Sequence, residues 1–312
     1  MRAVALRRGV RKAERRGWNM RRNWPIYVMI LPAVTLLTVF RYVPMYGTIA
    51  AFQRYKPWLG YRGSPWVGLD NYIRIFSRSD IWEIIRNTFV ISMGKIAIGE
   101  AASLVFALLL NEVSVVWFKR VIQTLSYLLY FLSWVLFGGI LVNILGFRGL
   151  LNSALGAFGL KPVLWLADPN LFQPVIVLTH TWKEYGWGAV VIIAALAGID
   201  PTLYEVAAVD GANRWQRVLH ITLPGVAPMV VMLLCLSLGN VLNAGFEQLL
   251  VMQNSAVLST GDILETYVYR EGLQLQQYSL ATAVGLFRSI VGLVMVSLSW
   301  WLAGKLANYR IL

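Results

Sequence analysis

Six long apolar segments constrain the fold more than any other feature of this 312-residue sequence. Each is about 20 residues or longer, the length that a helix needs to cross the hydrocarbon core of a bilayer. The segments cover residues 26–51, 87–111, 121–145, 171–198, 224–252 and 280–305. Hydrophobic residues make up 58% of the chain and charged residues only 14%, which excludes an ordinary soluble domain. We therefore predict an all-α integral membrane protein with six transmembrane helices.

The distribution of basic residues sets the expected orientation. Segment 1–25 carries eight arginines and Lys12 against one acid, Glu14, so the positive-inside rule keeps it in the cytoplasm. With six spans, both termini are then cytoplasmic, although six Lys and Arg residues between 52 and 86 argue against placing that stretch outside. Because the net charge of +13 is concentrated at the N-terminus, topology explains it better than a nucleic-acid partner. The single cysteine, Cys235, cannot form an internal disulfide.

A polar loop, residues 199–223, separates the fourth and fifth apolar segments. Asp200 can cap a helix, Pro201 suits the first helical position and Gly211 is a natural stop, which predicts a short helix over about 201–210. A second short helix with one apolar stripe should follow. The stripe consists of Trp215, Val218, Leu219 and Thr222. Two short amphipathic helices joined by a glycine form a compact surface that another protein could bind.

This loop resembles the EAA loop of permease subunits in binding-protein-dependent ABC importers. The family pattern reads E-A-A, three residues, G, nine residues, I-x-L-P, and the chain departs from it once, at Val206. The residues assigned to the motif and its surroundings are Glu205, Ala207, Ala208, Asp210, Gly211, Ala212, Ile221, Leu223 and Pro224. The resemblance implies a type I importer permease of the maltose type, whose coupling helix docks into an ATP-hydrolysing subunit. The alternative is that the loop is an ordinary cytoplasmic linker between two membrane helices. A DNA-binding helix-turn-helix module is less consistent with the sequence, because such a module would not lie between two membrane-spanning segments.

A second resemblance concerns the cargo. Runs 243–248, 265–270 and 278–287 are similar to the sugar permeases for polysaccharides and complex oligosaccharides, a branch that includes importers of acidic sugars such as alginate. Cationic groups in or near the spans would suit an anionic chain. These are Arg41, Lys95, His180, Lys183 and Arg288.

The resemblance also implies a set of partners. They are a second homologous permease, two subunits that bind ATP and Mg, and a periplasmic or lipid-anchored solute-binding protein. The implied location is a bacterial inner membrane, where the chain crosses several times and contacts lipid.

Aromatic and amide residues in the spans are candidates for the substrate pathway. Sugar rings have apolar faces and hydroxyl rims, so aromatic plates with amide or charged groups between them suit their chemistry. We expect Asn240, Asn243 and Glu247 to lie on one face of the fifth helix and to line a pore. The full candidate set is Tyr130, Trp134, Trp182, Tyr185, Asn240, Asn243, Glu247 and Arg288. Helix packing, interfacial belts and internal ion pairs are the alternative roles for such residues.

The sequence contains no G-x-x-x-x-G-K-[ST] phosphate loop, no H-E-x-x-H, no G-x-S-x-G and no Cys/His metal spacing. We therefore expect no catalytic, cofactor-binding or metal-binding residues in this chain. Two other functions remain: an ion-coupled secondary sugar transporter using Glu100 or Glu247, and an enzyme acting on lipid-linked glycans with Glu184 and His180 as acid and base. Neither explains the spacing from Glu205 to Pro224.

Overall fold

The computed structural model describes residues 24–306, which fall into two compact units divided after Ile49. In the first unit, helices α2 (Trp24–Leu37), η1 (Thr38–Tyr42) and α3 (Val43–Met45) follow one another directly and lead into η2 (Tyr46–Phe52). Trp24–Phe52 is long and apolar enough to cross a membrane. Most of the predicted basic segment 1–25 lies outside the described residues.

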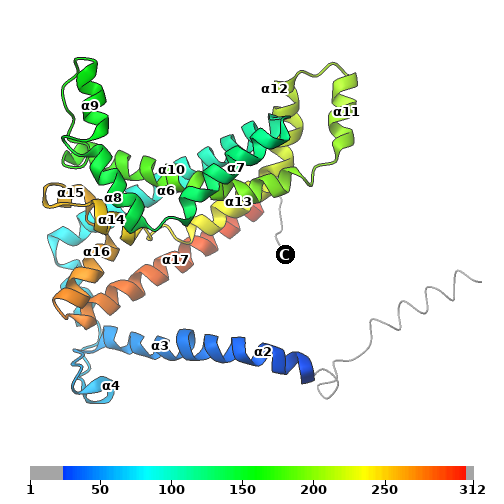
Figure 1. The fold of residues 1–312 in the computed structure, drawn as a ribbon. Helices are drawn as coiled ribbons and strands as arrows, with labels where there is room; N and C mark the ends of the chain where they lie inside the picture. The colour runs from blue at the N-terminus through cyan, green and yellow to red at the C-terminus, as the bar shows by residue number, and fades with distance from the viewer. Residues whose placement is uncertain (1–23, 307–312) are drawn as a thin grey trace, which may run out of the picture. The chain divides into compact units, whose positions relative to one another are not determined.

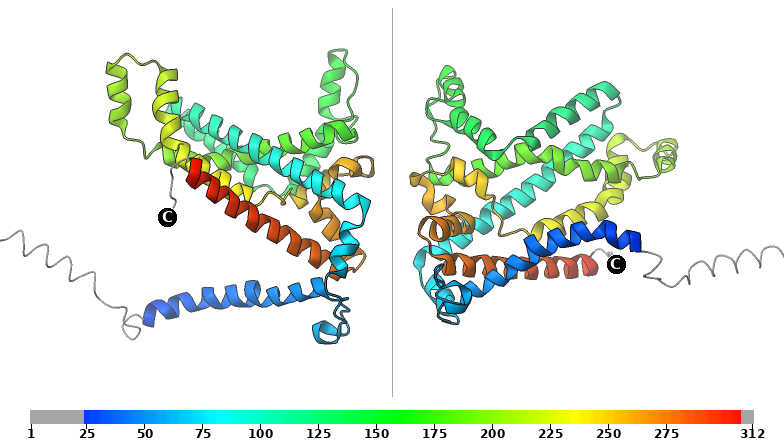
Figure 2. Two further views of the ribbon diagram at one scale, coloured as in Figure 1. Left: turned by 180° about the vertical axis from the view of Figure 1, so that it is seen from behind. Right: turned by 60° about the horizontal axis from the view of Figure 1, so that its bottom comes forward.

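Long helices dominate the second unit (Figures 1 and 2). They are α6 (Ser79–Glu112), α7 (Val116–Phe131), α10 (Pro169–Leu196), α13 (Leu223–Leu238) and α17 (Tyr278–Leu306). Helix α10 packs along α6, and Gly186 lets it approach α7 closely, because a Cβ there would lie 2.7 Å from the carbonyl oxygen of Ser126. All-helical architecture with such apolar helices confirms the predicted fold class.

Shorter helices connect these long ones. They are α4 (Gly60–Gly63), α5 (Asp70–Phe76), α8 (Trp134–Leu145), α9 (Leu150–Ala157), α11 (Pro201–Val209), α12 (Arg214–Arg217), η3 (Val218–Thr222), α14 (Phe246–Met252), η4 (Ser255–Val257), α15 (Leu258–Gly261), α16 (Leu264–Tyr269) and η5 (Arg270–Gln274). Among the described residues, five helical stretches could cross a membrane by length and composition. A sixth results if α10 and α11, which meet at 73°, count as one.

Two of the expected apolar segments are interrupted. The segment predicted at 121–145 divides into α7 and α8, and Ser133 caps α8 by accepting a hydrogen bond from the backbone N–H of Leu136. The segment predicted at 224–252 also divides, because α13 ends at Leu238 and α14 begins only at Phe246. Apolar composition continues across both breaks, which is why composition alone did not indicate them.

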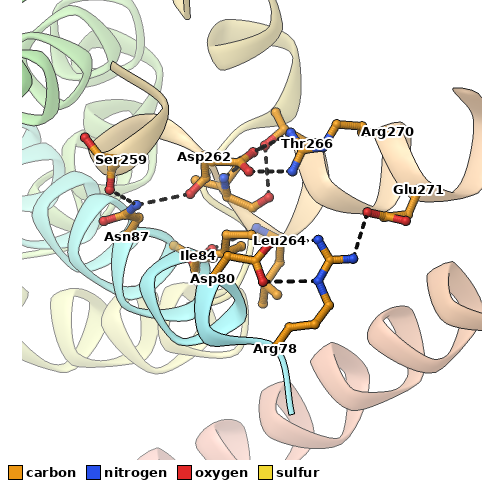
Figure 3. A network of polar contacts seen from close by, with 12 residues as sticks. Arg78, Asp80, Ile84, Asn87, Ser259, Asp262, Leu264, Thr266, Arg270 and Glu271 are labelled. Atoms are coloured by element: carbon orange, nitrogen blue, oxygen red, sulfur yellow. Dashed lines mark hydrogen bonds and ion pairs between the residues drawn. The ribbon is translucent and has the colours of Figure 1, made fainter. Parts of the chain in front are cut away.

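A network of ion pairs fastens residues 258–271 to the beginning of α6 (Figure 3). Arg270 pairs with Asp262 at 2.6 Å, while Arg78 pairs with Asp80 at 2.8 Å and with Glu271 at 3.2 Å. The ring of the fully buried Tyr267 lies 5.5 Å from the Arg78 guanidinium and 5.8 Å from that of Arg270. Hydrogen bonding to Asp262 raises the pKa of Arg270 above its ordinary value, so the Arg270 guanidinium stays protonated. Within the second unit, the network lies at the end opposite α11 and α12 (Figure 1).

Candidate functional site

The loop at 199–223 contains the predicted first short helix, α11, but the second predicted helix, α12 with η3, runs on without a break into α13. The Asp200 carboxylate accepts a hydrogen bond from the backbone N–H of Thr202 at 2.9 Å, which caps α11 and lowers the pKa of that carboxyl. Gly211 ends the turn after α11 with φ of +77°, a conformation that glycine adopts most easily. Asn213 and Gln216 then form a capping box that begins α12. Local side-chain chemistry therefore defines both helices.

Helix α11 presents an exposed surface that has no partner within the described residues. Leu203, Val206 and Val209 are 51%, 60% and 88% exposed. The Glu205 side chain is also exposed and forms no hydrogen bond or ion pair with residues 24–306. Val206, where the motif departs from the family pattern, points to open surface, so its extra bulk creates no conflict. An acid surrounded by exposed apolar side chains is suited to contact with another protein.

The other motif residues divide by burial. Ala207, Ala212, Ile221 and Leu223 are half-buried, whereas Ala208, Asp210, Gly211 and Pro224 are exposed. A hydrogen bond of 3.0 Å between the hydroxyls of Tyr204 and Thr222 connects α11 to η3. Helix α11 is therefore held to η3 by this hydrogen bond, while the outer side of α11 is exposed. Figures 1 and 2 show α11 and α12 at one end of the long helices.

A polar cavity of about 290 Å³ lies between α6, α10 and the break that follows α13. Its polar lining residues are Ser92, Lys95, Glu100, Ser103, His180, Glu184, Tyr185, Ser237, Asn240 and Asn243. A neighbouring cavity of about 380 Å³ shares Asn240 and Asn243 and is also lined by Arg288. Polar cavities among apolar helices are where cargo sites of transport proteins are expected.

Lys95 holds the wall of the polar cavity in place. Its buried ammonium donates to the carbonyl oxygen of Ala244 and to Oε1 of Gln248, both at 2.6 Å. Gln248 in turn donates to the carbonyl oxygen of Ile176 at 2.9 Å. Gly245, between them, has φ of +95°, and its N–H donates to Glu265 at 3.0 Å. These bonds supply partners for backbone groups that the break in the helix leaves free.

Two polar groups at this cavity have no hydrogen-bond partner among the described residues. They are Oγ of Ser92, whose residue is 2% exposed, and Nδ1 of His180. Glu100, in contrast, accepts a hydrogen bond from Ser237 at 2.9 Å. Because a buried polar group without a partner is costly, Ser92 and His180 are suited to bind a hydroxyl group or a water molecule.

A second buried lysine lies beside the cavity in an aromatic cage. The ammonium of Lys183 is 5.3 Å from the ring centres of both Tyr130 and Trp134, and it donates to the carbonyl oxygen of Tyr130 at 2.9 Å. Trp187 stacks on Tyr130 with ring centres 4.5 Å apart. Glu184 completes the cage with an ion pair of 3.3 Å to Lys183. The cage compensates the cost of burying this charge.

The structure brings together part of the predicted pathway. Tyr185, Asn240 and Asn243 line the polar cavity, and Arg288 lines its neighbour. Tyr130 and Trp134 belong to the lysine cage instead of facing either of these two cavities. Two candidates lie apart: Trp182 packs edge-on against Phe137, and Glu247 is exposed on α14.

The expected stripe of Asn240, Asn243 and Glu247 on one helix does not exist, because α13 ends at Leu238. Asn243 instead donates to Asn240 at 2.9 Å within the break. The cavity also contains residues outside the predicted pathway set, namely Ser92, Lys95, Glu100, His180 and Glu184. The sequence indicated Lys95 and His180 as cationic groups suited to an anionic cargo and Glu100 and Glu184 only for the alternative functions, whereas no sequence signal marked Ser92.

Arg288 also has an internal partner. It pairs with Glu265 at 3.1 Å, the same carboxylate that accepts from Gly245. It therefore has a structural role as well as a position at a cavity. Within residues 24–306, no group of three or more His, Cys, Asp and Glu side chains could hold a metal ion.

The family model, one similar protein and one solved structure are all named for transport. Residues 103–307, which include the loop and most of the cavity, match the family described as binding-protein-dependent transport system inner membrane component. The polygalacturonan/rhamnogalacturonan transport system permease protein YteP of Bacillus subtilis (strain 168) is 40% identical over 90% of this chain and 88% of its own length. Protein LplB of the same organism is 38% identical over 92% of this chain and 90% of its own.

A solved structure is also similar. A chain from the crystal structure of a bacterial alginate ABC transporter, in complex with an alginate pentasaccharide-bound periplasmic protein, matches with a TM-score of 0.85 and 34% identity. The match covers 93% of this chain and 97% of that one.

Proposed function

The chain belongs to the family of binding-protein-dependent transport system inner membrane components, and we propose that it forms half of the path through which an ABC importer moves an oligosaccharide. The exposed, unpartnered surface of α11 is the observation that carries this proposal most directly. An exposed surface of this kind supports a role in which another subunit binds α11 and supplies the driving force. An ion-coupled transporter would leave that surface, and its motif, without a role.

The proposed cargo is an oligosaccharide of acidic sugars. YteP is named for polygalacturonan and rhamnogalacturonan, and the solved relative for alginate, all of which contain uronic acid units. In this chain, amides, unpartnered hydroxyl and imidazole groups, and the Lys95 ammonium meet at one cavity. Amides and hydroxyls suit the hydroxyl rim of a sugar, and an ammonium with a spare donor suits its carboxylate.

The proposed mechanism converts motion at α11 into a change of access to the cavity. One of two ATP-binding subunits would bind α11 through Glu205 and the exposed apolar side chains, and the pair would bind ATP and Mg and supply all of the hydrolysis. Helix α13 continues directly from η3, so displacement of the loop would move the residues at the break after Leu238. A loaded binding protein would favour one of the two access states by binding it more tightly.

The proposed assembly places this chain in a bacterial inner membrane beside a second, homologous permease. A periplasmic or lipid-anchored binding protein would deliver the sugar at the end held by the Arg78 and Arg270 network. Both termini and the loop 199–223 would face the cytoplasm. This orientation follows the basic residues of segment 1–25.

Disulfide cross-linking tests the contact that drives transport. The single native cysteine, Cys235, is buried, so Val209→Cys gives one exposed thiol on α11. We expect this variant to cross-link to a cysteine introduced in the surface groove of the ATP-binding subunit, and ATP to change the yield. Lys161→Cys, exposed on another loop, is the matched control. Equal yields at both positions would contradict the docking role of α11.

A further inference from the structure

An apolar groove lies where the end of α6 meets α12, separate from the polar cavity. It has a volume of about 340 Å³. The lining residues, which define the α6–α12 groove, are Val105, Leu108, Leu109, Glu112, Arg214, Trp215 and Val218. Val105 and Leu109 are 54% and 65% exposed, and Trp215 is 82% exposed. The groove therefore continues the exposed apolar side of α6 to the end of that helix.

Two opposite charges stand at this groove without partners. Neither Glu112 nor Arg214 forms a side-chain hydrogen bond or an ion pair anywhere in residues 24–306, and they do not pair with each other. A guanidinium binds phosphate well, and a carboxylate binds a primary ammonium. An exposed tryptophan beside charged groups at a helix end is typical of the level of lipid headgroups.

We propose that the α6–α12 groove binds one phospholipid whose headgroup carries both a phosphate and a primary ammonium, as phosphatidylethanolamine does. The phosphate would lie at Arg214, the ammonium at Glu112, and an acyl chain along Val105 and Leu109. The two charges favour this headgroup over a purely anionic one, because a purely anionic headgroup has no ammonium to pair with Glu112. This inference rests on the proposed location of this end at the membrane surface.

The consequence concerns the loop that receives the force. A lipid in the groove would connect α12 to α6, whereas the hydrogen bond between Tyr204 and Thr222 connects α11 to η3. The stiffness of the loop would then depend on the lipids available. The surface of α11 that is proposed to contact the ATP-binding subunit would remain free.

Lipid retention by the complete importer complex tests the site. The complex is reconstituted in nanodiscs of equimolar phosphatidylethanolamine and phosphatidylglycerol, released into detergent, and the bound lipids are counted by native mass spectrometry. The wild type should retain phosphatidylethanolamine preferentially. Glu112→Gln should lower the ratio of phosphatidylethanolamine to phosphatidylglycerol by about threefold, a typical effect of one exposed ion pair. Arg214→Gln should lower the retention of both lipids.

The controls separate this site from general membrane contact. Leu109→Gln should reduce retention without changing the ratio, and Lys161→Gln, outside the groove, should change neither. A wild-type preference for phosphatidylglycerol, an unchanged ratio in Glu112→Gln, or lipid that appears only after removal of the ATP-binding subunits would overturn the proposal. Because retention needs no transport, intact retention with no ATP-driven uptake would contradict only the proposed function.

Discussion

Replacement of Gly211 by alanine is the clearest test of the loop geometry. The glycine has φ of +77°, and no atom lies within 4 Å of the position that a Cβ would occupy. A clash with residues 24–306 is therefore excluded, and the cost of the substitution within this chain lies in the backbone conformation. For an alanine this left-handed conformation costs about 1–2 kcal/mol, which lowers the population of the native turn by a factor of about 5–30 relative to competing turns.

The assay for this prediction is ATP hydrolysis by the reconstituted complex, with and without loaded binding protein. Gly211→Ala should reduce the stimulation by binding protein, while Gly211→Asn should retain most of it, because asparagine tolerates the left-handed region. Gly285→Ala is the matched control, since Gly285 lies in α17 with a negative φ and equally open space. Equal stimulation in Gly211→Ala and wild type would refute the argument that this turn positions α11.

Three further predictions follow from the packing and the cavities. Lys95→Met should lower the free energy of unfolding by about 1–3 kcal/mol, because it leaves Oε1 of Gln248 and the neighbouring carbonyl without a donor; an unchanged melting temperature in detergent would contradict this. Gly186→Ala should lower the free energy of unfolding by about 1–3 kcal/mol, because its Cβ would lie too close to Ser126. The same thermal melt in detergent measures it, and Gly139→Ala is the control because no atom lies within 4 Å of the added Cβ. Arg288→Gln should reduce uptake of a uronate oligosaccharide more than uptake of a neutral one; equal losses in proteoliposomes would assign Arg288 a structural role alone.

The two-helix loop was predictable because its signals are local. The Asp200 cap and the Gly211 stop act within three or four residues of the helix ends that they define. The long apolar helices were predictable for a similar reason, since composition over about 20 residues decides them. The structure agrees with the sequence for α11 and for α6, α10 and α17, whereas the segments predicted at 121–145 and 224–252 are broken.

The break after α13 was not predictable, because distant residues hold it. Lys95 reaches Ala244 across 149 positions of sequence, and Glu265 accepts from Gly245 across 20. A pattern of Asn240, Asn243 and Glu247 assumes an unbroken helix, so it failed where these contacts replace the helical bonds. The polar cavity escaped prediction for the same reason: its lysine, histidine and carboxylates meet only after α6 packs on α10.

The central claim is that partner ATPases drive sugar through this chain. Its most direct test is ATP hydrolysis and uptake by proteoliposomes that contain this chain, its companion permease and the ATP-binding subunits, with binding protein loaded with defined uronate or neutral oligosaccharides. The account predicts that uronate-loaded binding protein stimulates hydrolysis and that uptake requires ATP. Uptake driven by an ion gradient through this chain alone, with no stimulation of hydrolysis by any loaded binding protein, would contradict it.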